Sequence, residues 1–273
     1  MSENIKLITG IPRSGTTLCC KLLNQRADVV ALHEPIIIPK SFTKTEALHS
    51  IEDQIAQFEY SIEQDLPFAH VDKGGLTTDN YVGLNFKNGL RQVSIRQGEV
   101  QLPALDKNSY SLIIKQNALF TALIPALSLQ FSMTCIVRNP VDVLLSWLTV
   151  DLPVNRGHIP AGERFDVKLK SSLQGEECLS RQLIIYQWFM TRFFSSGLPV
   201  IRYEDVISSD GAILDEILGW GAIERDSLRI QERSFDNNTL LTLDKAKAKL
   251  VSLNCGDLYA RTDIELALKV HGL

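Results

Sequence analysis

The chain has 273 residues, 45% of them hydrophobic and 22% charged, which is enough to bury the core of one large α/β domain or two small ones. Its formal net charge of −4 and pI near 5.8 argue against nucleic-acid binding, which needs clustered surplus Lys and Arg. We therefore expect any bound anion to be held by a few local cations, backbone N–H groups and helix N-termini.

Strands and helices are expected to alternate along the chain. The apolar run 5–9 ends at a glycine, and apolar residues then recur at helical spacing from Leu18 to Leu23, which predicts strand, loop and helix. The elements expected after these are strand 29–32, a helix opened by a capping box of Thr43 and Glu46, strand 111–115, helix 117–129, strand 133–137, a helix with Asn139 and Pro140 as N-cap and N1, a long helix through 179–193 ended by Gly197, and strand 200–203.

This alternation predicts an α/β fold, a three-layer parallel sheet with helices on both faces and ligands at the carboxyl ends of the strands. No repeat, low-complexity tract or linker interrupts the chain, so we expect a single domain over 1–273. Two long segments, 66–108 and 151–175, resist assignment, and long irregular insertions of this kind are usually binding loops or lids.

The cysteines and the N-terminus predict a cytoplasmic location. The chain lacks a CxxC pair, a His/Cys cluster at zinc-ligand spacing and a leader-like N-terminus, so we expect no metal and no secretory route. The longest apolar-leaning stretch, 118–129, is shorter than the ~20 residues that span a bilayer, so no membrane anchor is expected. The five cysteines are Cys19, Cys20, Cys135, Cys178 and Cys255.

Residues 10–17, Gly-Ile-Pro-Arg-Ser-Gly-Thr-Thr, have the spacing of a phosphate-binding Walker A loop between a strand and a helix. Glycines let successive N–H groups point inward, and the helix N-terminus adds its positive end, so the loop can hold a phosphate. Thr16 replaces the usual Lys, Arg13 is the cation of the loop, and no apolar run ending in a Mg²⁺-binding Asp follows. A conventional NTPase is therefore disfavoured.

The segment 12–18, Pro-Arg-Ser-Gly-Thr-Thr-Leu, resembles the 5′-phosphosulfate loop of sulfotransferases that use 3′-phosphoadenosine 5′-phosphosulfate (PAPS) and release PAP, most closely the bacterial and tyrosylprotein branch. Arg138, followed by Asn-Pro and with Ser146 eight residues later, is similar to the family's 3′-phosphate motif. The resemblance implies the P-loop-like sulfotransferase fold. It also implies these donor-binding residues: Pro12, Arg13, Ser14, Gly15, Thr16, Thr17, Arg138, Ser146 and Tyr203.

The resemblance also implies catalytic roles. Sulfuryl transfer needs in-line attack, cations around the sulfuryl oxygens and a base for the acceptor's proton. Glu34 occupies the position of the base, with His33 as the rival because a free imidazole titrates near neutral pH. Lys115 matches the lysine that stabilises the bridging oxygen, and Arg13 completes the set of cations. Asn117 departs from the cytosolic branch, which has a catalytic His there.

The function expected is sulfuryl transfer from PAPS to a hydroxyl or amine of a small molecule, without metal, nucleic acid or membrane. The alternatives are a P-loop kinase using ATP and Mg²⁺ and a non-catalytic nucleotide-binding protein. The two unassigned segments are expected to bind the acceptor. Their acidic residues suggest a cationic acceptor as a hypothesis: Asp72, Asp79, Asp151 and Asp166.

Overall fold

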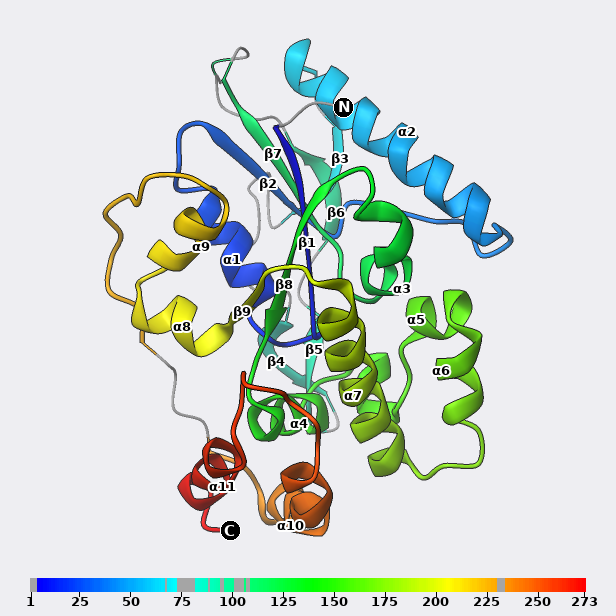
Figure 1. Ribbon diagram of the computed structural model, residues 1–273, viewed down its shortest axis with the longest axis vertical. Helices are drawn as coiled ribbons and strands as arrows, with labels where there is room; N and C mark the ends of the chain where they lie inside the picture. The colour runs from blue at the N-terminus through cyan, green and yellow to red at the C-terminus, as the bar shows by residue number, and fades with distance from the viewer. Residues whose placement is uncertain are drawn as a thin grey trace.

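The computed structural model describes residues 4–66, 68–72, 82–87, 89–93, 96–100, 106, 109–229 and 234–273. Its centre is a five-stranded, all-parallel sheet in the order β2-β7-β1-β8-β9 (Figure 1). The strands of this sheet are β1 (Ile5–Gly10), β2 (Val29–His33), β7 (Ser111–Lys115), β8 (Ser132–Val137) and β9 (Val200–Arg202). Two antiparallel pairs come from the segment between α2 and β7: β3 (Phe68–Asp72) with β6 (Arg96–Val100), and β4 (Val82–Lys87) with β5 (Leu90–Val93).

Helices cover both faces of the sheet, as Figure 1 shows. On one face lie α1 (Thr16–Leu23), α8 (Tyr203–Ser208) and α9 (Ala212–Ile217), and on the other α2 (Lys44–Glu63), α3 (Ala118–Leu127) and α7 (Cys178–Ser196). Beyond the sheet, α4 (Pro140–Leu148) packs against α10 (Asn237–Val251) and α11 (Arg261–Val270). Between α4 and α7 the chain forms η1 (Pro153–Arg156), α5 (Pro160–Phe165) and α6 (Val167–Ser172).

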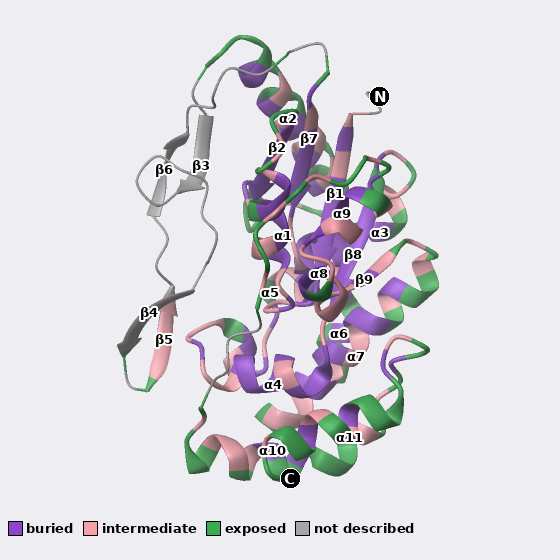
Figure 2. Ribbon diagram, turned by 90° about the vertical axis from the view of Figure 1, so that its left-hand side faces the viewer, coloured by how far each residue is buried: buried purple, intermediate pink, exposed green. Residues whose placement is uncertain are grey.

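The strands are buried on both faces, and their side chains divide between two cores. In β7, Leu112 and Ile114 belong to the core under α2, α3 and α7, whereas Ile113 belongs to the core under α1, α8 and α9. The same division separates Ile136 of β8 from its two neighbours, because successive side chains of a strand point to opposite faces. Figure 2 shows this buried interior, with α10 and α11 exposing one side to solvent.

The α/β fold, the parallel sheet and the main helices are confirmed. Thr43 and Glu46 form the expected capping box at the start of α2, and Gly197 ends α7 with a φ of 66°. The expected strand 200–203 is one residue too long, because Tyr203 already begins α8. The segment 151–175 is not irregular, since it forms η1, α5 and α6.

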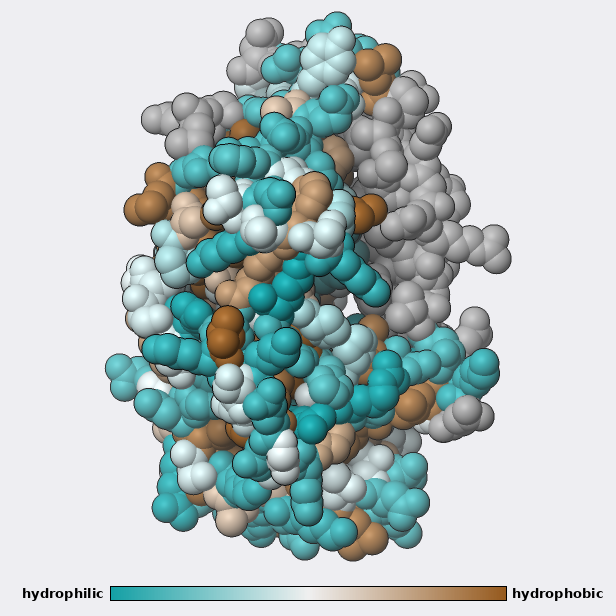
Figure 3. Space-filling view, turned by 90° about the vertical axis from the view of Figure 1, so that its right-hand side faces the viewer, coloured by the Kyte–Doolittle hydropathy of each residue, from teal (hydrophilic) through white to brown (hydrophobic). Residues whose placement is uncertain are grey.

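The described surface is largely hydrophilic on the face in Figure 3, where hydrophobic side chains are scattered singly. Scattered exposed hydrophobic residues are normal for a folded protein and mark no binding patch by themselves. Among the described residues, no helix is both long and apolar enough to cross a bilayer.

Candidate active site

A cavity of about 500 Å³ lies where the parallel strands end at their carboxyl edge. Register places His33 at the end of β2 beside Lys115 at the end of β7, and Arg138 directly follows β8. Ten of the twelve predicted site residues line this cavity, and the exceptions are Ser14 and Ser146. The lining residues from this edge are Pro12, Arg13, Gly15, Thr16, Thr17, Leu18, Lys21, His33, Glu34, Lys115, Gln116, Asn117, Arg138 and Tyr203.

The loop between β1 and α1 is shaped by a glycine in the left-handed region. Gly15 has a φ of 85° and is the N-cap of α1, so the N–H groups of the first turn face the cavity without a side-chain cap. A Cβ at this position would lie 2.3 Å from Cδ2 of Tyr203, so the tyrosine ring packs directly on the loop backbone. Trp147 Nε1 donates to the carbonyl of Pro12 at 2.8 Å and holds the other side of the loop. Backbone N–H groups at a helix N-terminus are a common arrangement for binding an anion.

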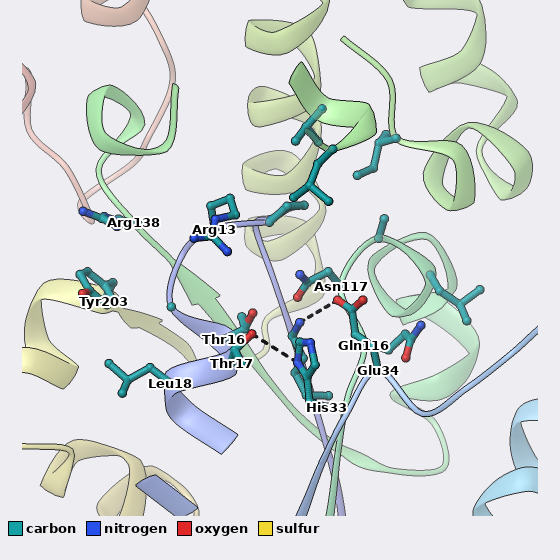
Figure 4. A pocket seen from close by; sticks show the side chains of 18 of the residues that line it. Arg13, Thr16, Thr17, Leu18, His33, Glu34, Gln116, Asn117, Arg138 and Tyr203 are labelled. Carbon is teal, nitrogen blue, oxygen red and sulfur yellow. Dashed lines mark hydrogen bonds and ion pairs between the residues drawn. The ribbon is translucent and has the colours of Figure 1, made fainter. Parts of the chain in front are cut away.

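Arg13 adopts a conformation that non-glycine residues rarely take, with a φ of 73°. Its Nε donates to Ser146 Oγ at 3.2 Å, which ties the loop to α4. Ser146 is buried and does not line the cavity, and Ser14 donates its hydroxyl to the carbonyl of Ile136. These serines therefore hold the loop in place in this structure, while the guanidinium of Arg13 faces the cavity (Figure 4).

A buried ion pair forms the floor of the cavity beneath the loop. Lys115 Nζ donates to Glu34 Oε1 at 2.7 Å, with the lysine side chain 1% exposed and the glutamate 29% exposed. Glu34 has a φ of 50°, and its N–H donates to the carbonyl of Lys115 at 2.7 Å. Strained backbone of this kind costs about 1–3 kcal/mol and is retained mainly where function needs it. Glu34 Oε2 has no hydrogen bond to any described residue.

His33 is buried next to this pair, and its Nδ1 lies 3.3 Å from Thr17 Oγ1. Figure 4 shows His33 directed toward Thr17 and Glu34 directed into the open part of the cavity. The two candidate bases therefore differ in position: the carboxylate is the more exposed group, and the imidazole lies under the phosphate loop.

Arg138 and Tyr203 lie at the far side of the cavity from Glu34 (Figure 4). The Arg138 guanidinium stacks on the Tyr203 ring at 4.5 Å from its centroid and pairs with Asp142 at 3.3 Å. Asp142 lies in the first turn of α4 and so contacts Arg138, the candidate residue for phosphate binding. Arg138 Nε is buried without a hydrogen-bond partner among the described residues, so a donor group on this side chain is left for a ligand.

A hydrogen-bond network behind Arg138 fixes the end of β8. Tyr186 Oη donates to the carbonyl of Arg138 at 2.8 Å, and the N–H of Asn139 donates to Glu204. Tyr259 donates to the second oxygen of Glu204 at 2.6 Å. Burial and the adjacent Glu204 carboxylate raise the pKa of Tyr259, so its hydroxyl stays a donor. The C-terminal part of the chain thus supports the site.

Sequence reasoning missed several residues that line the cavity, and the charged ones among them are Lys21 and Arg229, which adjoins Leu228. Lys21 lies one helical turn after Thr17, a spacing that could have revealed it. Leu228 and Arg229 belong to a stretch without regular structure, which offered no periodic signal. The Leu228 N–H donates to Asp210 Oδ1 at 2.6 Å. Nearby, the buried side chains of Arg225 and Asp215 form an ion pair with N–O distances of 2.6 and 2.9 Å.

The segment 151–175 contributes apolar residues to the other end of the cavity: Leu152, Pro153, Val154, Ile159, Pro160 and Ala161. Its acidic residues point elsewhere. Asp151 pairs with Arg156, and Asp166 caps α6 and accepts from Trp188 and Arg192. Asp72 lies in β3 but its side chain is outside the described residues, as is Asp79 altogether. The cationic-acceptor hypothesis therefore gains no support from Asp151 or Asp166.

The fold and cavity define an α/β protein with a ligand site at the carboxyl edge of a parallel sheet. The sequence profile of the sulfotransferase domain matches residues 5–216, and the chain belongs to this family. It is a transferase of sulfuryl groups in the general sense that the family defines. Among the residues described, no group of three or more His, Cys, Asp or Glu side chains could hold a metal ion.

One solved structure similar to the chain is a sulfotransferase from Alicyclobacillus acidocaldarius, at 14% identity, covering 98% of this chain and 96% of the other, with a TM-score of 0.43. No curated protein matches the chain.

Proposed function

We propose that the protein transfers the sulfuryl group of PAPS to a hydroxyl or amine of a small acceptor by metal-independent, in-line displacement. The observation that carries the proposal is the convergence of Arg13, Lys115 and Arg138 with Glu34 on one cavity at the sheet edge. Three cations suit a donor with two anionic groups, and one carboxylate suits the acceptor's proton.

The donor is proposed to lie across the cavity from the β1–α1 loop to β8. The N–H groups at the start of α1 and the side chains of Thr16 and Thr17 would hold the 5′-phosphosulfate, with Arg13 beside its oxygens. The orphaned Nε of Arg138 supports a role in binding the 3′-phosphate, and Tyr203 would face the adenine. Ser146 is proposed to assist here by fixing Arg13 through its hydroxyl.

In the proposed reaction the acceptor oxygen forms a bond to sulfur while the bond from sulfur to the bridging phosphate oxygen breaks. The electron pair of the broken bond goes to the phosphate of PAP, where Lys115 and Arg13 offset the new charge. Glu34 takes the acceptor's proton through Oε2, the oxygen that Lys115 does not occupy. His33 is the second candidate for this role, since it also lines the cavity.

Binding of PAP without metal tests the proposal. PAP should raise the Tm of the protein in the presence of EDTA, because a ligand that binds only the folded state stabilises it. Arg13→Ala and Arg138→Ala should each weaken PAP binding at least about 10-fold, a loss of about 1.4 kcal/mol. Arg261→Ala is the control, since that side chain is 74% exposed and lies on α11.

Transfer itself is tested with labelled PAPS and a panel of acceptors. Stabilisation by ATP with Mg²⁺ but not by PAP would overturn the proposal in favour of a kinase. PAP binding without transfer to any acceptor, together with no slow hydrolysis of PAPS, would favour a non-catalytic nucleotide-binding protein.

A further inference from the structure

The cavity has two chemically different ends, and the end away from Arg138 is apolar. Apart from Gln116 and Asn117, the described lining from the start of α3 and from the segment between α4 and α6 is apolar. The residues that form this apolar wall are Ala118, Leu119, Leu152, Pro153, Val154, Ile159, Pro160 and Ala161.

Hydrogen bonds from neighbouring side chains hold the backbone of the apolar wall in place. Asn155 Nδ2 donates to the carbonyls of Trp147 and Leu148 at 2.9 and 3.1 Å, and Gln182 Nε2 donates to the carbonyl of Val154 at 3.0 Å. Trp147 in turn contacts the phosphate loop through Pro12. The wall and the loop therefore share supports, which fixes the distance between an acceptor on one and a donor on the other.

Three polar side chains lie near the apolar wall: Glu34, Asn117 and Gln116, whose amide donates to the carbonyl of Ile36. Glu34 brings the unoccupied Oε2, and Asn117 brings an amide whose Oδ1 is buried without a hydrogen-bond partner among the described residues. Asn117 is the N-cap residue of α3, yet its side chain does not cap the helix. Asn117 and Glu34 both line the cavity, and Figure 4 draws them in the same part of it. A buried polar group without a partner is uncommon, so this amide is available to a ligand.

Charge at this end of the cavity selects against an ionised acceptor body. Glu34 is the only acidic residue in the described lining, and it is already paired with Lys115. An ammonium group against the wall would lose its hydration without gaining a partner among the described lining residues, and a carboxylate would do the same beside an anionic donor. A hydrocarbon body loses nothing there and gains about 25 cal/mol per Å² buried.

From these observations we infer that the acceptor is an uncharged alcohol whose hydrocarbon body lies on the apolar wall and whose hydroxyl sits between Glu34 and Asn117. The inference rests on the proposed sulfuryl transfer and names its substrate class. The hydroxyl proton goes to Glu34 Oε2, the oxygen forms the bond to sulfur, and PAP leaves with the electron pair of the broken bond. The Asn117 amide holds the hydroxyl in line with the donor and is itself a positioning group for the acceptor.

The test uses three alcohols of equal length that differ only at the far end: octan-1-ol, 8-aminooctan-1-ol and 8-hydroxyoctanoic acid. We expect kcat/KM with PAPS to be at least about 10-fold higher for octan-1-ol than for either charged alcohol. Ala161→Asp, at a partly exposed position of the wall, should reduce this preference or shift it to the amino alcohol. Val167→Asp is the matched control, because it places the same charge in the first turn of a short helix at a side chain 74% exposed.

PAP binding separates the outcomes. If PAP binds and either charged alcohol reacts as well as octan-1-ol, the inferred acceptor class is wrong while sulfuryl transfer stands. If PAP binds but none of the alcohols reacts, calorimetry on the enzyme–PAP complex decides: tighter binding of octan-1-ol supports the inference, and equal or absent binding overturns it. If PAP itself does not bind, the proposed function fails and the inference with it.

Discussion

Replacing Gly15 with alanine tests how the phosphate loop and Tyr203 shape the donor site. The backbone φ of 85° costs a non-glycine residue about 1–2 kcal/mol. The new Cβ would also lie 2.3 Å from Tyr203 Cδ2 and 2.6 Å from Cε2, whereas carbon atoms pack at about 3.5–4.0 Å, so the ring must move by about 1 Å or more. That movement breaks the stack of Tyr203 with Arg138, worth about 0.5–2 kcal/mol.

Gly197→Ala separates the two costs, because Gly197 has a φ of 66° at the end of α7 and open space around its Cβ position. We expect this control to lose only the backbone contribution, about 1–2 kcal/mol in urea unfolding, and to bind PAP as the wild type does. Gly15→Ala should lose more stability and bind PAP at least about 10-fold more weakly by calorimetry.

A double variant tests the assigned cause. In a Tyr203→Ala background, Gly15→Ala should cost no more stability than Gly197→Ala, because the clash partner is gone. The reasoning is refuted if Gly15→Ala matches Gly197→Ala in both stability and PAP affinity, or if the cost of Gly15→Ala is unchanged without the Tyr203 ring.

Three further predictions concern charged side chains. Glu34→Gln should lower kcat about 10²–10⁴-fold with PAP affinity unchanged, since glutamine still accepts from Lys115; an unchanged kcat would exclude Glu34 as the base. Asp215→Ala should cost about 3–5 kcal/mol and lower Tm in calorimetry, because it leaves the buried Arg225 guanidinium unpaired; a drop as small as for an exposed pair would contradict this. Burial opposes ionisation of Asp166, but hydrogen bonds from Arg192 and Trp188 outweigh it and lower the pKa of this carboxyl. A carboxyl whose pKa is lower in the folded state stabilises the protein at pH values above its unfolded pKa of about 3.9. Asp166→Asn should therefore lose its full contribution to the free energy of unfolding at pH 7, and the loss measured in urea should shrink below pH 4. A loss that does not change with pH would refute this prediction.

The strand ends of the site could be predicted because their signals are local. Apolar runs that stop at Lys115 and Val137 mark buried strands, and parallel strands bring their carboxyl ends to one edge of the sheet. The family resemblance added the residues that follow these ends. In the structure Arg13, Glu34 and Arg138 all line one cavity at this edge, as expected for residues that follow parallel strands.

The helices of segment 151–175 could not be predicted because they are short. Helices of about six residues are unstable alone and form only when tertiary packing supports them. Asp166 serves as cap of α6 and as partner of Arg192, which lies 26 residues later, so its role depends on the packing of α6 against α7. In sequence the same aspartate was indistinguishable from a ligand-binding residue.

The sequence by itself determined the alternation of strands and helices, the glycine-containing loop between β1 and α1 and the positions of the candidate charges, because periodicity and glycine placement act within a few residues. Only the tertiary structure decided that Ser146 supports Arg13 and that Leu228 and Arg229 border the cavity. It also decided that apolar residues from α3 and from the segment between α4 and α6 line the same cavity. Each of these facts depends on residues far apart in the chain, whose meeting is set by core packing and buried ion pairs.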